Sequence, residues 1–182
     1  FRARHDLPKN DTLVGYTGRH GHEKCLPDIL AACEQLDDDV TVVFGGDGPA
    51  REELEVEARY RDLDARFLGF LDRDELPAFY ATLDAFLFPS PVETQGLVAL
   101  EAFACGTPVV GVDSGALSDT VENGVTGYHY QQGDIGGFAA AIKRTLDERD
   151  TLREGCLEKR TAISVDSSVD QLSSVYTELC TE

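Results

Sequence analysis

Residues 85–111 read AFLFPSPVETQGLVALEAFACGTPVVG and contain two short apolar runs separated by a segment of helix length. The runs are residues 85–88 and 108–111, and neither alternates between apolar and polar side chains. Apolar runs without alternation are typical of strands that are covered on both faces of a parallel sheet. We therefore expect a strand–helix–strand unit whose helix, at about residues 96–105, crosses over the sheet.

The same alternation of strands and helices extends along the chain from residue 12 onward. Strands are expected at residues 13–17, 40–44, 66–70, 85–88, 108–111 and 127–130, and helices at about residues 24–36, 50–60, 74–82, 96–105, 118–122, 134–148, 151–161 and 167–179. This order predicts an α/β fold with a Rossmann-like parallel sheet and helices on both faces. Ligands of such sheets bind beyond the carboxyl ends of the strands.

The composition excludes several classes of protein. The chain has 182 residues, 42% hydrophobic and 27% charged, which suits one globular domain. Its net charge of −18 would repel a phosphate backbone, so nucleic acid is not an expected partner. No apolar run approaches the ~20 residues of a membrane span. Five cysteines without a C-x-x-C pair indicate neither a disulfide framework nor a thiolate metal site, and we expect a cytosolic compartment.

A glycine-rich turn follows the first expected strand. Residues 15–24 read GYTGRHGHEK and lead into a helix, with Arg19 and Lys24 flanking the turn. Glycines let the backbone approach a ligand, and a helix N-terminus attracts negative charge, so the turn suits an anion. A tight turn with two solvated cations is the alternative. His20 and His22 lack a third metal ligand nearby in the sequence.

Two glutamates accompany the strand–helix unit at residues 85–111. Glu93 lies in the loop before the helix, and Gly96 opens the helix. Glu101 is five residues further on, about 7.5 Å along the axis, which is too deep for a helix cap. A carboxylate at that depth needs partners if it is buried, and the paired hydroxyls of a ribose would satisfy it. Alone, two glutamates eight residues apart also suit a solvated helix face.

Together, these features resemble the family 4 retaining glycosyltransferases, which have the GT-B fold. Residues 89–111 resemble the Glu-x7-Glu signature of that family, and Gly18-Arg19 with Glu23-Lys24 resembles its phosphate-binding turn. Residues 46–49 and 115–127 resemble two further family loops. The resemblance implies that residues 1–182 are the donor-binding lobe, with residues 1–11 as an interdomain lead-in. The chain starts at Phe1 without methionine, and we expect an acceptor-binding N-terminal lobe to be missing from it.

The resemblance also implies roles for individual residues. Glu93 would contact the transferring sugar, Arg19 and Lys24 would bind the diphosphate of a nucleoside diphosphate sugar, and Glu101 would bind the ribose. The remaining donor-binding positions implied are Gly18, Phe70, Leu71, Gln95, Gly96, Leu97 and Val98. Transfer in this family is retaining and requires neither a metal nor another cofactor. Membrane association of the full-length protein is expected through the missing lobe.

The chain departs from the family pattern at three places. Cys25 stands where glycine is usual, and we expect this change to affect a helix-packing contact alone. Gln95 replaces the common phenylalanine, and Ser118-Asp119 replaces the usual Pro-Glu. If the glycine-rich loop at residues 115–127 has the role that the resemblance implies, Gly115, Asp119 and Gly127 line the donor site.

Two other functions remain open from the sequence. A sugar-nucleotide 2-epimerase shares the two-lobed fold, although the Glu93/Glu101 spacing favours transfer. A nucleotide-binding module without catalysis is the second, and we expect the isolated lobe to be inactive because the acceptor would bind elsewhere. A metal-dependent glycosyltransferase has less support, because Asp37–Asp39 precede their strand and Asp72 with Glu75 predicts a helix capping box.

The charge pattern yields a prediction about salt. Asp outnumbers Glu and Arg outnumbers Lys, which suits a surface that stays hydrated in concentrated salt, where self-repulsion is screened. We therefore expect a halophilic source and a free energy of unfolding that falls as salt is withdrawn. Thermal melts across a salt series test this prediction. Equal stability in dilute buffer would contradict it.

Overall fold

The computed structural model describes residues 1–36 and 40–180, and in them six strands form one all-parallel sheet. Their order across the sheet is β3-β2-β1-β4-β5-β6, so the chain starts near the middle and builds outward in both directions. The strands are β1 (Thr12–Thr17), β2 (Val40–Gly45), β3 (Ala65–Gly69), β4 (Ala85–Phe88), β5 (Val109–Val112) and β6 (Gly127–Tyr130).

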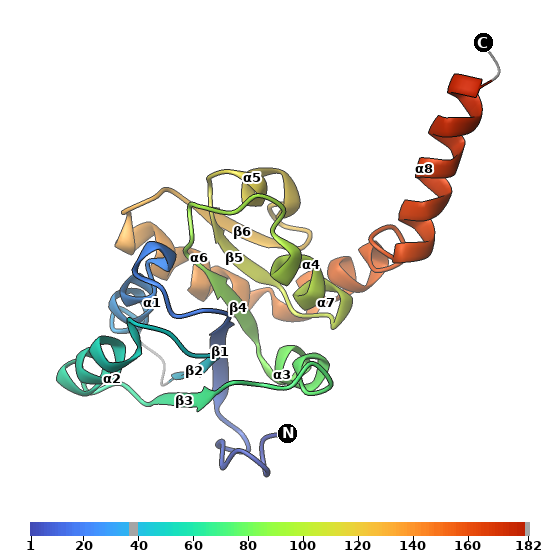
Figure 1. Cartoon of the computed structure of the whole chain (residues 1–182). Coiled ribbons are helices and arrows are strands. Elements are labelled where there is room, and N and C mark those ends of the chain that lie inside the picture. Colours follow the sequence, from blue (N-terminus) through green and yellow to red (C-terminus); the bar gives the residue numbers. More distant parts are fainter. Residues whose placement is uncertain (37–39, 181–182) are drawn as a thin grey trace.

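Helices cover both faces of this sheet (Figure 1). On one face lie α1 (Pro27–Cys33), α2 (Arg51–Tyr60) and α6 (Ile135–Asp147), and on the other lie α3 (Leu76–Thr82), α4 (Leu97–Ala104) and α7 (Arg149–Lys159). The short α5 (Ala116–Thr120) follows β5, and α8 (Val165–Cys180) extends away from the body. The predicted Rossmann-like sheet with helices on both faces is confirmed. No described helix is both long and apolar enough to cross a membrane.

The central strands form the core because their side chains are apolar on both faces. Every residue of β2 and β4 is buried, as the unalternating runs predict. Aromatic rings fill the space between sheet and helices, and Phe86 stacks with Tyr16 while meeting Tyr80 edge-on. The edge strand β3 is only half-buried. The sheet thus provides a rigid base for the loops at its carboxyl edge.

The first predicted helix is the element that differs most from expectation. Instead of one helix at residues 24–36, a 3₁₀-helix η1 (His22–Lys24) precedes α1, and Cys25 separates them with φ +53°. Cys25 therefore adopts the left-handed conformation that glycine tolerates best, at a cost of about 1–2 kcal/mol for other residues. The expectation that this position affects helix packing alone was wrong. Pro27 is the first residue of α1, a position that tolerates proline because its missing N–H would have no acceptor within the helix.

The predicted capping box at Asp72 and Glu75 is also wrong. Glu75 is itself the N-cap residue of α3 and makes no side-chain capping bond. Its carboxylate instead faces Arg4 at 3.3 Å and His5 at 3.5 Å, so it joins the start of the chain to α3. Asp37–Asp39, which the sequence placed before β2, lie outside the described residues.

Two glycine loops touch each other at the carboxyl ends of β1 and β2. Gly18 donates its N–H to the carbonyl of Gly45 at 3.1 Å, and Gly46 has φ +102°. A Cβ atom added to Gly46 would lie 2.0 Å from the carbonyl oxygen of Gly18. This contact leaves no room for any side chain, so both loops have a fixed separation.

Replacing Gly46 by alanine should therefore destabilise the fold severely. We expect Gly46→Ala to lower the free energy of unfolding by at least about 3 kcal/mol, because strained backbone and overpacking add together. Gly133→Ala is the matched control, since Gly133 also has a positive φ, +80°, but no atom lies within 4 Å of the added Cβ. That variant should lose about 1–2 kcal/mol. Urea unfolding measures both, and equal losses would contradict the close contact.

Candidate functional site

Two adjoining cavities open at the carboxyl edge of the sheet. The first has a volume of about 420 Å³ and the second about 520 Å³. Thr17, Gly18 and Arg19 line both, so the end of β1 forms their common wall. The rest of the first cavity is lined by Tyr16, Glu23, Lys24, Phe88, Glu93, Thr94, Gln95, Gly96, Leu97 and Val98, and the rest of the second by Gly46, Asp47, Phe70, Leu71, Arg73 and Leu76.

The sheet topology places this site. From β1 the chain continues to β2 on one side, and β4 later pairs with β1 on its other side, where Gly15 lies opposite Phe86. The loops after β1 and β4 therefore leave neighbouring strands in opposite directions and a crevice opens between them, which is the usual place for ligands in open α/β sheets. Both sequence motifs follow these two strands.

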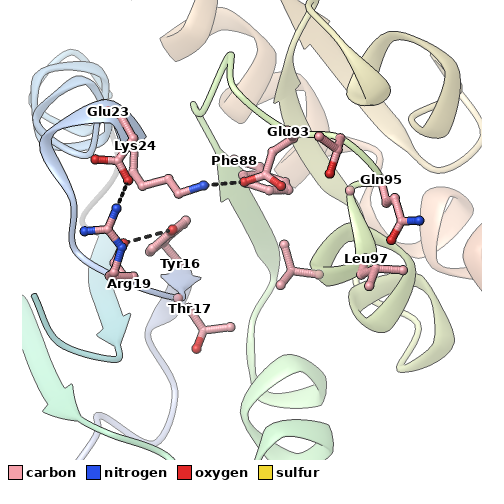
Figure 2. A pocket seen from close by; sticks show the side chains of 13 residues that line it. Tyr16, Thr17, Arg19, Glu23, Lys24, Phe88, Glu93, Gln95 and Leu97 are labelled. Carbon is pink, nitrogen blue, oxygen red and sulfur yellow. Dashed lines mark hydrogen bonds and ion pairs between the residues drawn. The ribbon is translucent and has the colours of Figure 1, made fainter.

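The cations of the first cavity are already paired with carboxylates (Figure 2). Lys24 Nζ lies 2.5 Å from Glu93 Oε1, and this contact joins η1 to the loop between β4 and α4. The Arg19 guanidinium donates to the Glu23 carboxylate within its own turn. The Lys24 and Glu93 side chains are 18% and 21% exposed, so their ion pair is partly shielded from water. An anion entering the cavity must compete with both carboxylates.

The Glu93 loop is held in place by backbone contacts. Gly96, with φ +62°, ends the loop, and α4 begins at Leu97. The first N–H groups of a helix have no acceptor within the helix and carry partial positive charge, and residues of this first turn line the cavity. On the other side of the loop, Ala116 donates its N–H to the carbonyl of Glu93 at 3.4 Å.

Sequence reasoning missed the structural role of His20. Its ring is fully buried, and Nε2 donates to the carbonyl of Gly45 at 3.2 Å. Its backbone N–H donates to Asp47 O, and its carbonyl accepts from Ala50 N, so His20 joins the two glycine loops. Burial lowers the pKa of His20, which keeps the ring neutral. A histidine between two glycines, as in Gly18-Arg19-His20-Gly21, is the sequence signal that could have suggested this role.

The two histidines of the turn do not share a site. His22 lies on the surface, with Nδ1 at 3.6 Å from a carboxylate oxygen of Glu53, whereas His20 lies inside. In the described part of the chain, no group of three or more His, Cys, Asp or Glu side chains is arranged to hold a metal ion.

Tyr16 is a second residue that the sequence did not single out. It lines the first cavity and is almost completely buried, with its hydroxyl 3.5 Å from the carbonyl of Arg19. Burial, and then the nearby charge of Glu93, raise the pKa of Tyr16, so the phenol stays neutral. It gives the floor of the cavity a neutral hydroxyl group.

The second cavity is mainly apolar and has an aromatic side chain at its edge. Phe70 is 83% exposed, although exposed phenylalanine is unfavourable, and Leu71 behind it is buried. Such an exposed ring next to an apolar pocket offers a surface on which a flat ring can stack. Phe70 and Leu71, both predicted donor-binding residues, thus meet Gly18 and Arg19 across one cavity.

Ten of the predicted site residues line the two cavities, and Glu101 does not. Glu101 is exposed on α4, one turn beyond Leu97, and its Oε2 accepts a hydrogen bond from the Tyr80 hydroxyl at 2.8 Å. Gly115, Asp119 and Gly127, which the late loop suggested, line neither cavity. Gly115 lies instead behind the Glu93 loop, where an added Cβ would be 3.1 Å from the carbonyl oxygen of Glu93.

Comparison with known proteins gives the same lobe in longer chains. Glycogen synthase of Mycobacterium tuberculosis is 41% identical over 138 residues, which are 73% of this chain and 33% of that protein. D-inositol 3-phosphate glycosyltransferase of Salinispora tropica is 37% identical over all of this chain and 41% of its own length. This chain therefore spans less than half of each of these relatives.

Solved structures match the fold closely. Sucrose-phosphate synthase from Thermosynechococcus elongatus has a TM-score of 0.85 at 30% identity, over 99% of this chain and 48% of that one. HepE of Anabaena, in complex with UDP, has a TM-score of 0.84 at 25% identity, over 93% of this chain and 49% of that one. Residues 1–162 match the family described as glycosyl transferases group 1. The chain belongs to the group 1 glycosyltransferases, as one Rossmann-like lobe of their GT-B fold.

Proposed function

We propose that the chain is the donor-binding lobe of a retaining, metal-independent hexosyltransferase and that it binds a nucleoside diphosphate sugar. The observation that carries this proposal is the convergence of Arg19, Lys24 and the start of α4 on one cavity, which adjoins an apolar cavity edged by Phe70. The first cavity suits the diphosphate and the sugar, and the second suits the base. HepE, a structural neighbour, was solved with UDP, which supports a nucleotide ligand.

The charges of the first cavity suit a leaving diphosphate. The chain has a net charge of −18 and four lysines, yet Lys24 and Arg19 line the first cavity together with the N-terminal turn of α4, which carries partial positive charge. Cations and backbone N–H groups fixed in advance stabilise charge that develops on the leaving group, without a metal ion. Glu93 is close enough to Lys24 to lie beside the diphosphate, and there its carboxylate would contact the transferring sugar.

The acceptor half of the reaction belongs to the rest of the protein. The relatives are more than twice as long as the part that this chain matches, which supports an acceptor-binding lobe outside the present sequence. The isolated lobe should then bind donor without transferring sugar, and contact with a membrane surface would come through the other lobe. The relatives transfer glycosyl groups, and this favours transfer over the 2-epimerase alternative.

Lys24→Ala tests the role of the diphosphate site. Loss of a hydrogen bond to a charged group should cost about 1.5–3 kcal/mol of binding free energy, or roughly 10- to 150-fold in affinity for a nucleoside diphosphate. The affinity for the matching monophosphate should change less. Titration calorimetry with the uridine, guanosine and adenosine forms measures both.

Lys143→Ala is the matched control for the lysine variant. Lys143 is exposed on α6, so its removal changes the net charge equally without touching the cavity. Its affinity for nucleoside diphosphates should equal that of the unmodified chain. Equal losses in the two variants would show that Lys24 acts through net charge alone and would contradict the proposed contact.

Glu93→Gln should separate the sugar from the diphosphate. The variant frees Lys24 from its ion pair and removes a negative charge beside the diphosphate. Affinity for the bare nucleoside diphosphate should therefore rise about two- to fivefold, the range of a modest ion pair. The ratio of the affinity for the intact diphospho-sugar to the affinity for the bare diphosphate should fall, because a neutral glutamine accepts more weakly from the sugar hydroxyls than the Glu93 carboxylate does.

Both ligands are titrated against the Glu93 variant, with thermal melts as the control for folding. A parallel loss for the diphosphate and the diphospho-sugar would contradict the division of roles. In the full-length enzyme the same variant should lower turnover more than substrate binding, as expected for a contact that is strongest in the transition state.

A further inference from the structure

Tyr80 contacts Glu101, a predicted site residue that lies outside the two cavities. Its hydroxyl donates to Glu101 Oε2 at 2.8 Å, and this bond joins α3 to α4. Glu101 is exposed, so a ligand can reach its carboxylate, whereas Tyr80 is only 1% exposed. A buried phenol thus holds one oxygen of an exposed carboxylate.

The tyrosine is fixed along its whole length. Its ring meets Phe79 and Phe86 edge-on, with ring centroids 5.7 and 5.4 Å apart, and its carbonyl accepts from Thr107 Oγ1 at 2.7 Å. Burial, and then the bond to Glu101, raise the pKa of the phenol, so it remains a donor. The hydroxyl therefore occupies a constant position at the surface of the core.

This bond lies beside both cavities. Leu76, one helical turn before Tyr80, lines the second cavity, and Leu97, one turn before Glu101, lines the first. Four residues of helix span about 6 Å, so this bond lies about one helical turn from a lining residue of each cavity, and the two cavities meet at Thr17, Gly18 and Arg19. In a nucleoside diphosphate the ribose joins the base to the phosphates, so it must occupy that region when the two ends fill the cavities.

We infer that Tyr80 is a positioning residue for ribose recognition, which fixes the Glu101 carboxylate so that it accepts from the ribose hydroxyls. This inference rests on the proposed function. A free glutamate side chain loses rotamer entropy when it is ordered. The bond to Tyr80 orders the side chain before the ligand arrives, so less of that cost falls on binding.

The alternative is that the bond merely ties α3 to α4. Both roles predict some loss of stability in Tyr80→Phe, which keeps the ring and removes one oxygen. The two roles differ in ligand selectivity, because a bond that only joins two helices would not contribute to the preference for ribose over 2′,3′-dideoxyribose. The decisive measurement is therefore the ratio of affinities for paired ligands.

The test uses UDP, GDP and ADP with their 2′,3′-dideoxy forms, titrated calorimetrically against the 182-residue chain. The unmodified chain should prefer the ribose form of the nucleotide that it binds. In Tyr80→Phe, affinity for this form should fall about five- to tenfold while affinity for the dideoxy form stays constant. Tyr80→Phe combined with Glu101→Gln should lose no more than Glu101→Gln alone, because both changes act on one contact.

Tyr128→Phe is the matched control. Its hydroxyl also donates to a glutamate, Glu148, but neither residue lines either cavity. This variant should keep the full preference for ribose. Thermal melts measure the stability of all variants.

Each remaining outcome overturns a stated claim. Equal losses for ribose and dideoxy forms in Tyr80→Phe, or no loss at all, would overturn the positioning role while leaving the proposed function intact. Equal affinity of the unmodified chain for both forms would overturn ribose recognition by Glu101. If none of the six nucleotides binds the unmodified chain, the proposed function itself fails, and the inference fails with it.

Discussion

The parallel pairing of β1 with β4 is the constraint on which the site depends. Val14 lies opposite Ala85 and Gly15 opposite Phe86, so two segments some 70 residues apart in sequence end side by side. As a consequence of this pairing, the glycine-rich turn after β1 and the Glu93 loop after β4 face each other. Without this pairing, Lys24 and Glu93 would belong to separate surfaces.

If the first cavity binds the diphosphate, as proposed, its paired charges make it selective as well as attractive. Arg19 and Lys24 are neutralised by Glu23 and Glu93, so the site is not an open patch of positive charge. A lone small anion must break an ion pair and gains few contacts in return. A larger ligand that fills both cavities gains stacking and backbone contacts besides, and these offset the lost ion pair. The pairing of each cation thus favours ligands that reach from Phe70 to Glu93.

The sequence was sufficient for the architecture because burial on both faces gives a strong signal. The runs at β2 and β4 predicted their strands closely, and the alternation of strands and helices predicted a parallel sheet with helices on both faces. Prediction from the sequence failed where the conformation of a single residue determines the path of the backbone. Cys25 in a left-handed conformation splits the first helix, although cysteine carries no such signal. The resemblance implied that the loops after β1 and β4 belong to the site, and residues of both loops line the cavities. It also suggested Gly115, Asp119 and Gly127, which line neither cavity. The bonds of His20 and Tyr80 depend on residues distant in the sequence, which a motif does not reveal.

Burial separates the parts of the site that stay fixed from the parts that must change partner. Tyr16, His20 and Tyr80 are almost completely buried, and their neutral polar groups bond backbone or carboxylate groups. Lys24 and Glu93 are partly exposed and bound to each other, and under the proposed function their ion pair is the contact that a ligand would replace. Neutral buried donors need no counter-ion, so they keep their positions whether or not an anion is bound. A charged group buried as deeply would stay paired, because separating a buried ion pair leaves an uncompensated charge, and exchangeable charges therefore require partly exposed side chains such as Lys24 and Glu93.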